Sequence, residues 1–436
     1  MYFQLQYRIP SLRQLSVLCL LSLAISTAQA AEPLSLDNAL TAALSTNPGL
    51  AAIEARVEAL AEIPDQFEAL PDPVLSVNLL NLPLDSFSFT QEGMTQLQVG
   101  IVQALPFPGK LALRSQVAQH QVGAAEADVA EWRLQLARDV KTLWWNIFYL
   151  DRALEVIARN QVLLKQFVNV AETRYTVGRG LQQDILLAQL ELSKLGDSMI
   201  RVENRRENEA VRLNVLMNHP AADPVQLPHE VDEQLRKSSS SEVLLERAKT
   251  TRPKLQAQTE RMSAARSRIE LEKKGYAPNF KVGAMYGLRG GSNPDGSRRS
   301  DFGSIVFSMN LPIYTGSKQD RAVDQRNAEW IQQKYQLHDQ QNLVASQVQQ
   351  AITDYRWGGE QTRLFQQEII PQARQTVDAM LAGYQVGKVD FLSLIRAQTT
   401  LYDYETQYWK ALSAANQAMA RLVAAVGDAD EEHIYE

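Results

Sequence analysis

The spacing of apolar residues predicts a broken helix near the N-terminal end of the chain. Over residues 36–63 apolar side chains recur at steps of three and four, the period of an amphipathic helix. The pair Asn47-Pro48 interrupts this stretch, and because proline lacks a backbone N–H donor we expect a break or kink there. Pro71-Asp72-Pro73 ends the helical region.

The period of the pattern then changes to two. Between residues 73 and 104, apolar residues alternate with Ser, Asn, Gln or Gly, which predicts a hairpin of two β-strands of about ten residues each. The alternating apolar positions are Leu75, Val77, Leu79, Leu97, Val99 and Ile101. One apolar and one polar face is a pattern shared by the strands of membrane barrels and by amphipathic hairpins in soluble sheets.

A very long helix is expected next. Residues 110–174 contain no proline, and their apolar positions continue in steps of three and four. At the rise of an α-helix this segment is on the order of 100 Å long, far beyond an ordinary globular helix. Such a helix needs a partner along its length, so we expect coiled-coil-like packing against a second helix over residues 181–217.

The second half of the chain repeats this order after a connector at residues 221–241, which is rich in proline and serine. The pattern predicts a helix over 242–274 with a break at Arg252-Pro253, and strands within about 279–311. Long helices follow at about 317–381, with a bend at Pro371, and at about 390–426.

Landmarks in the two halves match at a nearly constant offset. Pro48 and Pro253, Pro73 and Pro278, and Pro106 and Pro312 differ in residue number by 205 or 206. We therefore interpret the chain as two structural repeats, residues 31–220 and 242–436, which arose by internal duplication. The stiff turns that join strand to helix are expected at Pro106, Pro108 and Gly109, and again at Pro312 and Gly316.

Each pair of long helices is joined by a similar glycine turn. Tyr175-Thr176-Val177-Gly178 in the first half matches Tyr384-Gln385-Val386-Gly387 in the second, at an offset of 209. Glycine in this position is typical of a helix C-cap with positive φ. We refer to these two turns, residues 174–181 and 383–390, as the tips.

The first 30 residues have the composition of a signal peptide. Arg8 and Arg13 precede an apolar run at residues 15–25, and Ala28-Gln29-Ala30 is a cleavage pattern. Lipidation of Cys19, the single cysteine, is not expected because a leucine precedes it. No later stretch is apolar enough for a spanning helix, so any membrane part is expected to be a β-barrel.

Neither composition nor motifs predict chemistry. The net charge is −6 without a basic tract, which argues against a nucleic-acid partner. The five histidines show no helical pair with metal-ligand spacing, and no catalytic or phosphate-binding motif is present. We expect no cofactor, no metal site and no catalytic residue. The aromatic cluster at Trp144, Trp145, Phe148 and Tyr149 is interpreted as helix packing.

The repeated order of strand pair, very long helix, Tyr-x-Val-Gly tip and returning helix resembles the TolC-type outer-membrane efflux factors. The resemblance implies a mainly α fold with a small β part. It implies a homotrimer in which each chain gives four strands to a twelve-stranded outer-membrane β-barrel, continued by a periplasmic α-helical barrel. A periplasmic adaptor and an inner-membrane resistance-nodulation-division (RND) pump are the implied partners.

Several short segments look most like the heavy-metal branch of this family, whose implied substrates are metal cations. They are Pro71-Asp72-Pro73, Asn81-Leu82-Pro83, Ser86-Phe87, Met94-Thr95 and Phe107-Pro108-Gly109-Lys110.

The resemblance also implies that the tips form the gate and contact the adaptor, through Tyr175, Gly178, Asp184, Tyr384, Gly387 and Asp390. Asp184 and Tyr384 match an acid and a tyrosine that hold the mouth shut in relatives. Val389, Ser393 and Arg396 depart from the arginine and the acids found there in relatives.

The sequence thus favours a passive exit duct in the outer membrane of a Gram-negative cell, not an enzyme. A drug-efflux or type I secretion duct of the same family is the alternative within transport. A soluble periplasmic coiled-coil scaffold is the alternative from another class.

Overall fold

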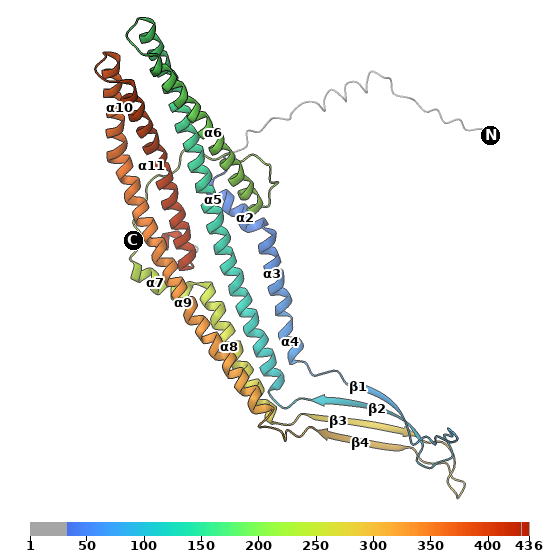
Figure 1. The fold of residues 1–436 in the computed structure, drawn as a ribbon. Coiled ribbons are helices and arrows are strands. Elements are labelled where there is room, and N and C mark those ends of the chain that lie inside the picture. The colour runs from blue at the N-terminus through green and yellow to red at the C-terminus, as the bar shows by residue number, and fades with distance from the viewer. Residues whose placement is uncertain (1–32, 429, 436) are drawn as a thin grey trace, which may run out of the picture.

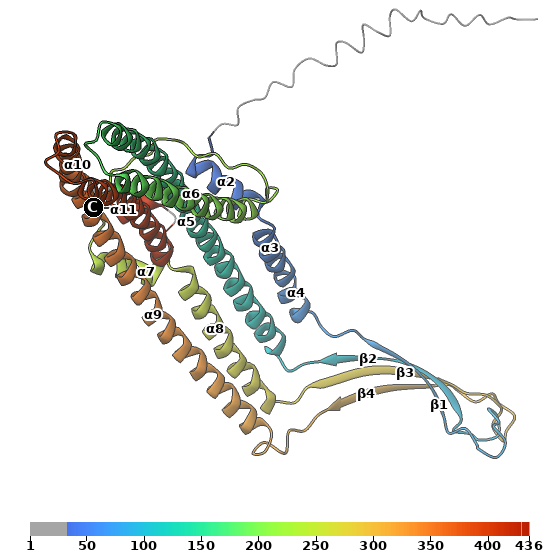
Figure 2. The same ribbon diagram turned by 45° about the horizontal axis from the view of Figure 1, so that its top comes forward.

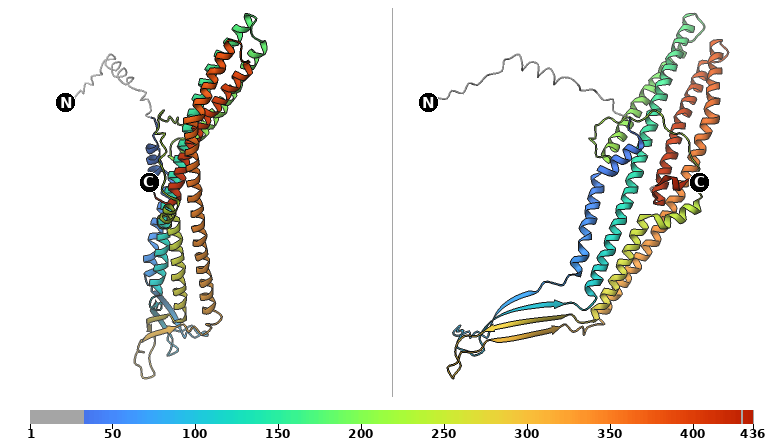
Figure 3. Two further views of the ribbon diagram at one scale, coloured as in Figure 1. Left: turned by 90° about the vertical axis from the view of Figure 1, so that its left-hand side faces the viewer. Right: turned by 180° about the vertical axis from the view of Figure 1, so that it is seen from behind.

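The computed structural model describes residues 33–428 and 430–435. The predicted signal peptide, with Cys19, lies outside these residues. Long helices run along the molecule and a small sheet projects from one end of them (Figure 1). In the edge-on view of Figure 3 the elements overlap into a narrow profile, so the helices form a wall rather than a globule.

Three consecutive helices form the N-terminal part: α2 (Leu36–Thr46), α3 (Pro48–Ala61) and α4 (Ile63–Glu68). The break between α2 and α3 lies at the predicted Asn47-Pro48, where the Asn47 side chain accepts hydrogen bonds from the N–H groups of the next helix. A second break before α4 was not expected from the pattern. Pro64 stands at the start of α4, where its missing N–H leaves no hydrogen bond unmade.

The first hairpin consists of α5 (Lys110–Thr176) and α6 (Gln182–Leu216). With 67 residues, α5 is the longest helix described. It packs against α6, α8 (Pro253–Lys273) and α11 (Phe391–Val426). Figure 2 shows α3, α5, α8 and α9 (Gln319–Leu364) side by side as they approach the sheet. The long helix thus has a neighbour along its whole length.

The second half contains α7 (Ser241–Thr251), the short 3-10 helices η1 (Lys274–Tyr276) and η3 (Glu431–Ile434), and the hairpin of α9, α10 (Ile370–Gln385) and α11. The helix expected at 317–381 is divided by a π-helix, η2 (Phe365–Ile369), and ends at Gln385. Pro371, in the first turn of α10, lacks the N–H that would continue the hydrogen-bond ladder. Next to Pro371, where the pattern predicts a bend, the structure thus has a π-helical insertion.

The four strands form one antiparallel sheet in the order β1 (Val74–Leu80), β2 (Gln96–Leu105), β3 (Phe280–Leu288) and β4 (Phe302–Met309). Pairing of β2 with β3 joins the two halves of the chain. Within the described residues, β1 pairs only with β2, and β4 pairs only with β3. The sheet therefore has two open edges.

The two faces of the sheet differ in chemistry. The register places Leu75, Ile101, Ala284 and Ile305 in one row across all four strands. This face is exposed although it is apolar: 87% of Ile305 is accessible. The opposite face carries Ser76, Gln98 and Ser304, and here Gln98 is 8% exposed. No described helix is long and apolar enough to cross a membrane.

Two buried clusters lie where the short helices α2 and α7 pack against the long hairpins. Trp144, Trp145 and Phe148 pack between α2, α6 and the connector, and Trp144 stacks on Phe148 at a ring distance of 5.7 Å. The aromatic residues thus pack between helices, as expected. A second cluster joins α7, α9 and α11 and includes Ile434.

Equivalent contacts recur in the two halves. The Thr46 hydroxyl donates to the carbonyl of Met217 at 2.8 Å, and the Thr251 hydroxyl donates to the carbonyl of Val426 at 2.8 Å. One position breaks the equivalence: Arg252, where the first half has Asn47, forms a buried ion pair with Glu131, Nη2 to Oε1, at 2.7 Å. Burial lowers the pKa of the Arg252 guanidinium, and the Glu131 carboxylate partly offsets this.

Candidate functional site

Both tips have the same backbone geometry. In the first, the N–H of Arg179 donates to the carbonyl of Arg174 at 2.8 Å. The N–H of Gly178 donates to the carbonyl of Tyr175 at 3.0 Å. The second repeats the two bonds from Lys388 to Gly383 and from Gly387 to Tyr384, at 2.9 and 3.0 Å. These are Schellman motifs, which satisfy the last carbonyls of a helix.

The motif requires a left-handed residue after the helix. Gly178 has φ 69° and Gly387 has φ 75°, a region that costs other L-residues about 1–2 kcal/mol. An added Cβ on Gly178 would meet nothing within 4 Å, so the backbone angle alone selects glycine there. The tips are therefore tight, defined turns.

The structure brings Tyr384 and Asp184 together across the two hairpins. The Tyr384 hydroxyl donates to Asp184 Oδ2 at 3.3 Å, and the tyrosine is 3% exposed. Burial and the negative charge of Asp184, opposed in part by Arg174, raise the pKa of the Tyr384 phenol to about 12. The phenol therefore remains a hydrogen-bond donor across the physiological pH range.

Two further side chains enclose Tyr384. The guanidinium of Arg174 lies 4.5 Å from the ring centroid of Tyr384, and the ring centroid of Phe391 lies 5.1 Å from it. Arg174 also donates from Nη2 to the carbonyl of Arg179 at 3.2 Å, which ties it to its own turn. A cation over a partly desolvated ring contributes up to about 2 kcal/mol, so Arg174 is a second link between the hairpins.

Asp390 is the N-cap residue of α11, and none of the described hydrogen bonds or ion pairs joins it to the first hairpin. Its carboxylate caps α11 by accepting from Ser393 N and Ser393 Oγ, both at 2.8 Å. These bonds, with the positive charge of Arg396, lower the pKa of the Asp390 carboxyl. Asp390 is thus engaged with its own helix, while Val389 is half-buried and Arg396 is exposed.

Matched tip residues have different surroundings. Tyr175, at the position equivalent to Tyr384, is 48% exposed. The residue equivalent to Asp184 is Ser393, so Tyr175 has no equivalent of the bond that Tyr384 makes to Asp184 across the hairpins. Between the two tips lies a groove of about 620 Å³ whose walls include Arg174, Asp184 and Tyr384.

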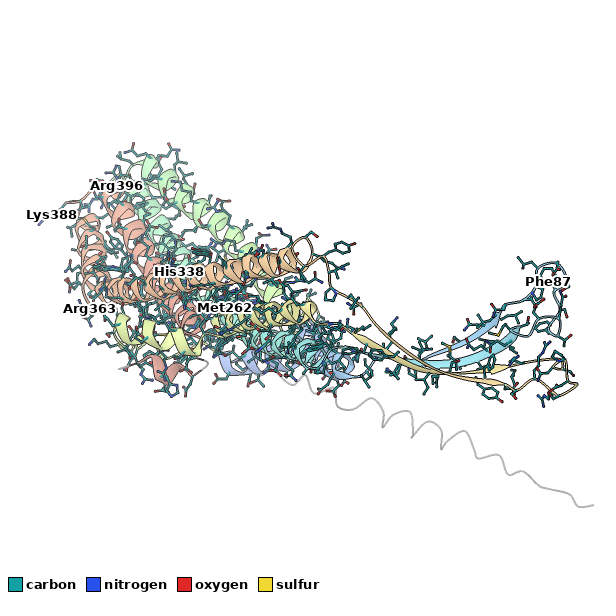
Figure 4. All side chains as sticks on the ribbon, turned by 90° about the horizontal axis from the view of Figure 1, so that it is seen from below. Phe87, Met262, His338, Arg363, Lys388 and Arg396 are labelled. Carbon is teal, nitrogen blue, oxygen red and sulfur yellow. The ribbon has the colours of Figure 1, made fainter. Side chains whose placement is uncertain are left out.

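The strand-to-helix turns lie at the opposite end of the helices. Figure 4 shows Lys388 and Arg396 near one end of the molecule and Phe87 near the other. Gly109 has φ 84° and begins α5 directly. Between Pro106 and Pro108, Phe107 N donates to Asn279 Oδ1 at 3.1 Å, so the first turn is fixed to the second half.

The matching turn at Pro312 and Gly316 is built differently. Gly316 does not have a positive φ, and α9 begins later, at Gln319. Here the N–H of Lys318 donates to the carbonyl of Tyr314 at 3.1 Å. Similar sequence in the two turns thus gives two different backbone paths.

The sequence did not predict the contact of Arg174 with the ring of Tyr384. It also did not predict the buried hydrogen bond from Gln398 Nε2 to Asn160 Oδ1, 2.5 Å long, which joins the hairpins as well. A difference between the repeats could have pointed to Arg174, because the residue at the equivalent position of the second tip is Gly383. Within residues 33–428 and 430–435 no group of three or more His, Cys, Asp or Glu side chains is placed to hold a metal ion.

A four-stranded sheet with open edges, continued by two long helical hairpins, defines the fold class of outer-membrane efflux channels. The chain belongs to the outer membrane efflux protein family, whose sequence model matches residues 39–219 and 244–428. It is accordingly a protein of the Gram-negative outer membrane, and a soluble scaffold is set aside.

Relatives and solved structures agree with this assignment. The outer membrane protein TolC of Vibrio cholerae is 20% identical over 73% of each chain. The cobalt-zinc-cadmium resistance protein CzcC of Cupriavidus metallidurans is 19% identical over 89% of each. The solved structure of the outer-membrane channel OprN has a TM-score of 0.77 at 17% identity and covers 90% of this chain and 89% of its own, which shows the shared fold.

Gly178→Ala is expected to loosen the first tip, because alanine costs about 1–2 kcal/mol in the left-handed region. The matched control is Gly196→Ala in α6, where an added Cβ also meets nothing within 4 Å but the backbone is helical. Hydrogen exchange of amides 174–181 should accelerate about tenfold in the first variant only. Equal exchange in both variants would show that the tip does not depend on this angle.

Proposed function

We propose that the protein is the exit duct of a tripartite efflux system that exports metal cations. Three copies would form a channel through the outer membrane and periplasm, without chemistry of their own. Energy would come from an RND-type inner-membrane pump linked by a periplasmic adaptor. The observation that carries the proposal is the open-edged sheet with an exposed apolar face.

An exposed apolar face is unfavourable in water, and open strand edges are unfavourable in lipid. In a bilayer every backbone N–H and C=O group must find a partner within the protein. Pairing of β1 in one copy with β4 in the next would satisfy both edges and close twelve strands from three chains. The exposed row through Leu75 and Ile305 would then contact lipid.

The helical wall supports a tunnel that continues the barrel. An origin by duplication, with repeats at residues 31–220 and 242–436, is supported by the matched helix caps and by the matched contacts of Thr46 and Thr251. It is also supported by the two segments that the family model matches. Two similar hairpins per copy would give six around a threefold axis. The tips, at the end far from the sheet, would be the inner mouth of the tunnel and would contact the adaptor.

The contacts between the hairpins support a gate at this mouth. Tyr384, Asp184 and Arg174 hold the second hairpin against the first at its tip. Opening requires the hairpins to separate, so these contacts would stabilise the closed state. Val389, Ser393 and Arg396 form no ion pair between the hairpins among the described contacts. At the tips the latch would therefore rest on Tyr384 with Asp184 and Arg174.

The substrate class rests on the relatives. CzcC, named for cobalt, zinc and cadmium resistance, matches 89% of this chain, whereas TolC of Vibrio cholerae matches 73%. The fuller match favours metal cations over other cargo. A passive duct need not bind its cargo, so this proposal requires no metal site in the chain.

Tyr384→Phe is expected to increase channel conductance in planar bilayers, because it removes the bond to Asp184 and keeps the ring. A hydrogen bond to a charged group contributes about 1.5 kcal/mol, which corresponds to about tenfold in the ratio of open to closed channels. The matched control is Tyr276→Phe, which removes a bond to Asp320 of 2.5 Å at the opposite end of the helices. A Tyr384→Phe channel that conducts like the wild type would exclude this latch.

Deletion of the gene is expected to make its host more sensitive to cobalt, zinc or cadmium, and the wild-type gene should restore growth. Growth on graded metal and on graded hydrophobic antibiotics would be compared in the same strains. Sensitivity to the antibiotics alone would reassign the duct to drug efflux.

A further inference from the structure

A single charged side chain lies on the four strands. Across Val74–Leu80, Gln96–Leu105, Phe280–Leu288 and Phe302–Met309, the only Lys, Arg, Asp or Glu is Lys281. It stands second in β3, next to the helical part of the molecule, and is exposed. No carboxylate on these strands offsets its charge.

The register places Lys281 on the polar face of the sheet. Its partners across the sheet are Ala104 on β2 and Ser308 on β4. Side chains alternate along a strand, so Lys281 shares its face with Gly283, Met285 and Gly287, and with Gln98 on the neighbouring strand. Phe280 and Val282 point to the opposite, apolar face.

Crowding shows that the polar face is the inner one. An added Cβ on Gly100 would lie 2.6 Å from Met285 Cγ, and one on Gly287 would lie 1.8 Å from Gln96 Oε1. Both glycines belong to this face, where Gln96 and Gln98 are nearly buried, whereas the apolar face is widely exposed. The polar face is therefore the more enclosed of the two, and Lys281 on it would face the lumen of a closed barrel.

We infer that Lys281 forms a ring of three ammonium groups at the junction of barrel and tunnel, and that this ring shifts the ion preference of the duct toward anions. The inference rests on the proposed function, because the ring requires three copies around a water-filled lumen. It assigns Lys281 as the residue that sets the balance of small ions in the lumen. The ring opposes cations, so it does not select the proposed metal cargo, which the pump would drive through the duct.

The size of the barrel decides whether such a ring acts on passing ions. Twelve strands about 4.8 Å apart and tilted by about 40° give a radius of about 12 Å. An inward lysine lies closer to the axis than this, within the Debye length of about 10 Å at 0.1 M salt. Three charges at about 8 Å change the local ion concentration about threefold at 0.1 M, and the effect is screened at 1 M.

The test is the reversal potential of the purified channel in planar bilayers across a potassium chloride gradient near 0.1 M. The ratio of chloride to potassium permeability is expected to fall about tenfold in Lys281→Gln, because the ring enriches chloride and depletes potassium about threefold each, and to fall further in Lys281→Glu. Lys281→Arg keeps the charge and should keep the wild-type ratio. Repetition near 1 M should reduce the differences.

A Lys281→Glu channel that conducts with the wild-type permeability ratio would overturn the inference and leave the duct intact. A ratio changed equally by Lys281→Arg would also overturn it, because shape and not charge would be responsible. Absence of any conductance from both the wild-type protein and the Tyr384→Phe variant would instead count against the proposed duct.

Discussion

Backbone hydrogen bonding at the two outer strands constrains the rest of the molecule. β1 and β4 each present an unpaired row of N–H and C=O groups. One face of the sheet, which includes Leu75 and Ile305, is apolar and exposed. A single chain of four strands cannot close on itself, and an open edge is a site for pairing with another chain. Under the proposed function the partner of each edge would be another copy of the same chain. Closure would also fix the helices, since Phe107 and Asn279 join the strands to α5 without a flexible linker.

The two hairpins show how similar sequences acquire different roles through their surroundings. Both tips close with the same two backbone bonds, yet Tyr384 is buried between the hairpins while Tyr175 faces outward. Asp184 lies across from Tyr384, whereas Ser393 takes the equivalent place in the other repeat. The second hairpin also contains the π-helix at Phe365–Ile369, and α5 has no such interruption. The two similar hairpins of the chain thus share one latch contact, which the repeat does not duplicate.

Much of this architecture could be predicted because each element has a simple period. Alternation located the four strands, three- and four-residue steps located the long helices, and the glycines located both tips. The contact of Tyr384 with Asp184 came from the family resemblance and not from the spacing. Long-range contacts without local signals were missed: Arg174 over Tyr384, Gln398 with Asn160, and the buried pair of Arg252 with Glu131. The π-helix was missed too, since one extra residue per turn leaves almost no trace in an apolar pattern.

Closure of the sheet by three copies can be tested directly with cysteine pairs on the outer strands. The only native cysteine is Cys19, in the predicted signal peptide, so Val77→Cys would be combined in turn with Gly303→Cys, Ile305→Cys or Phe307→Cys. Oxidation of outer-membrane fractions should give covalent trimers for at least one pair, without larger species, and each single variant should remain monomeric on denaturing gels. Monomers from every pair, or a ladder that extends beyond trimers, would contradict closure of β1 on β4 around a threefold axis.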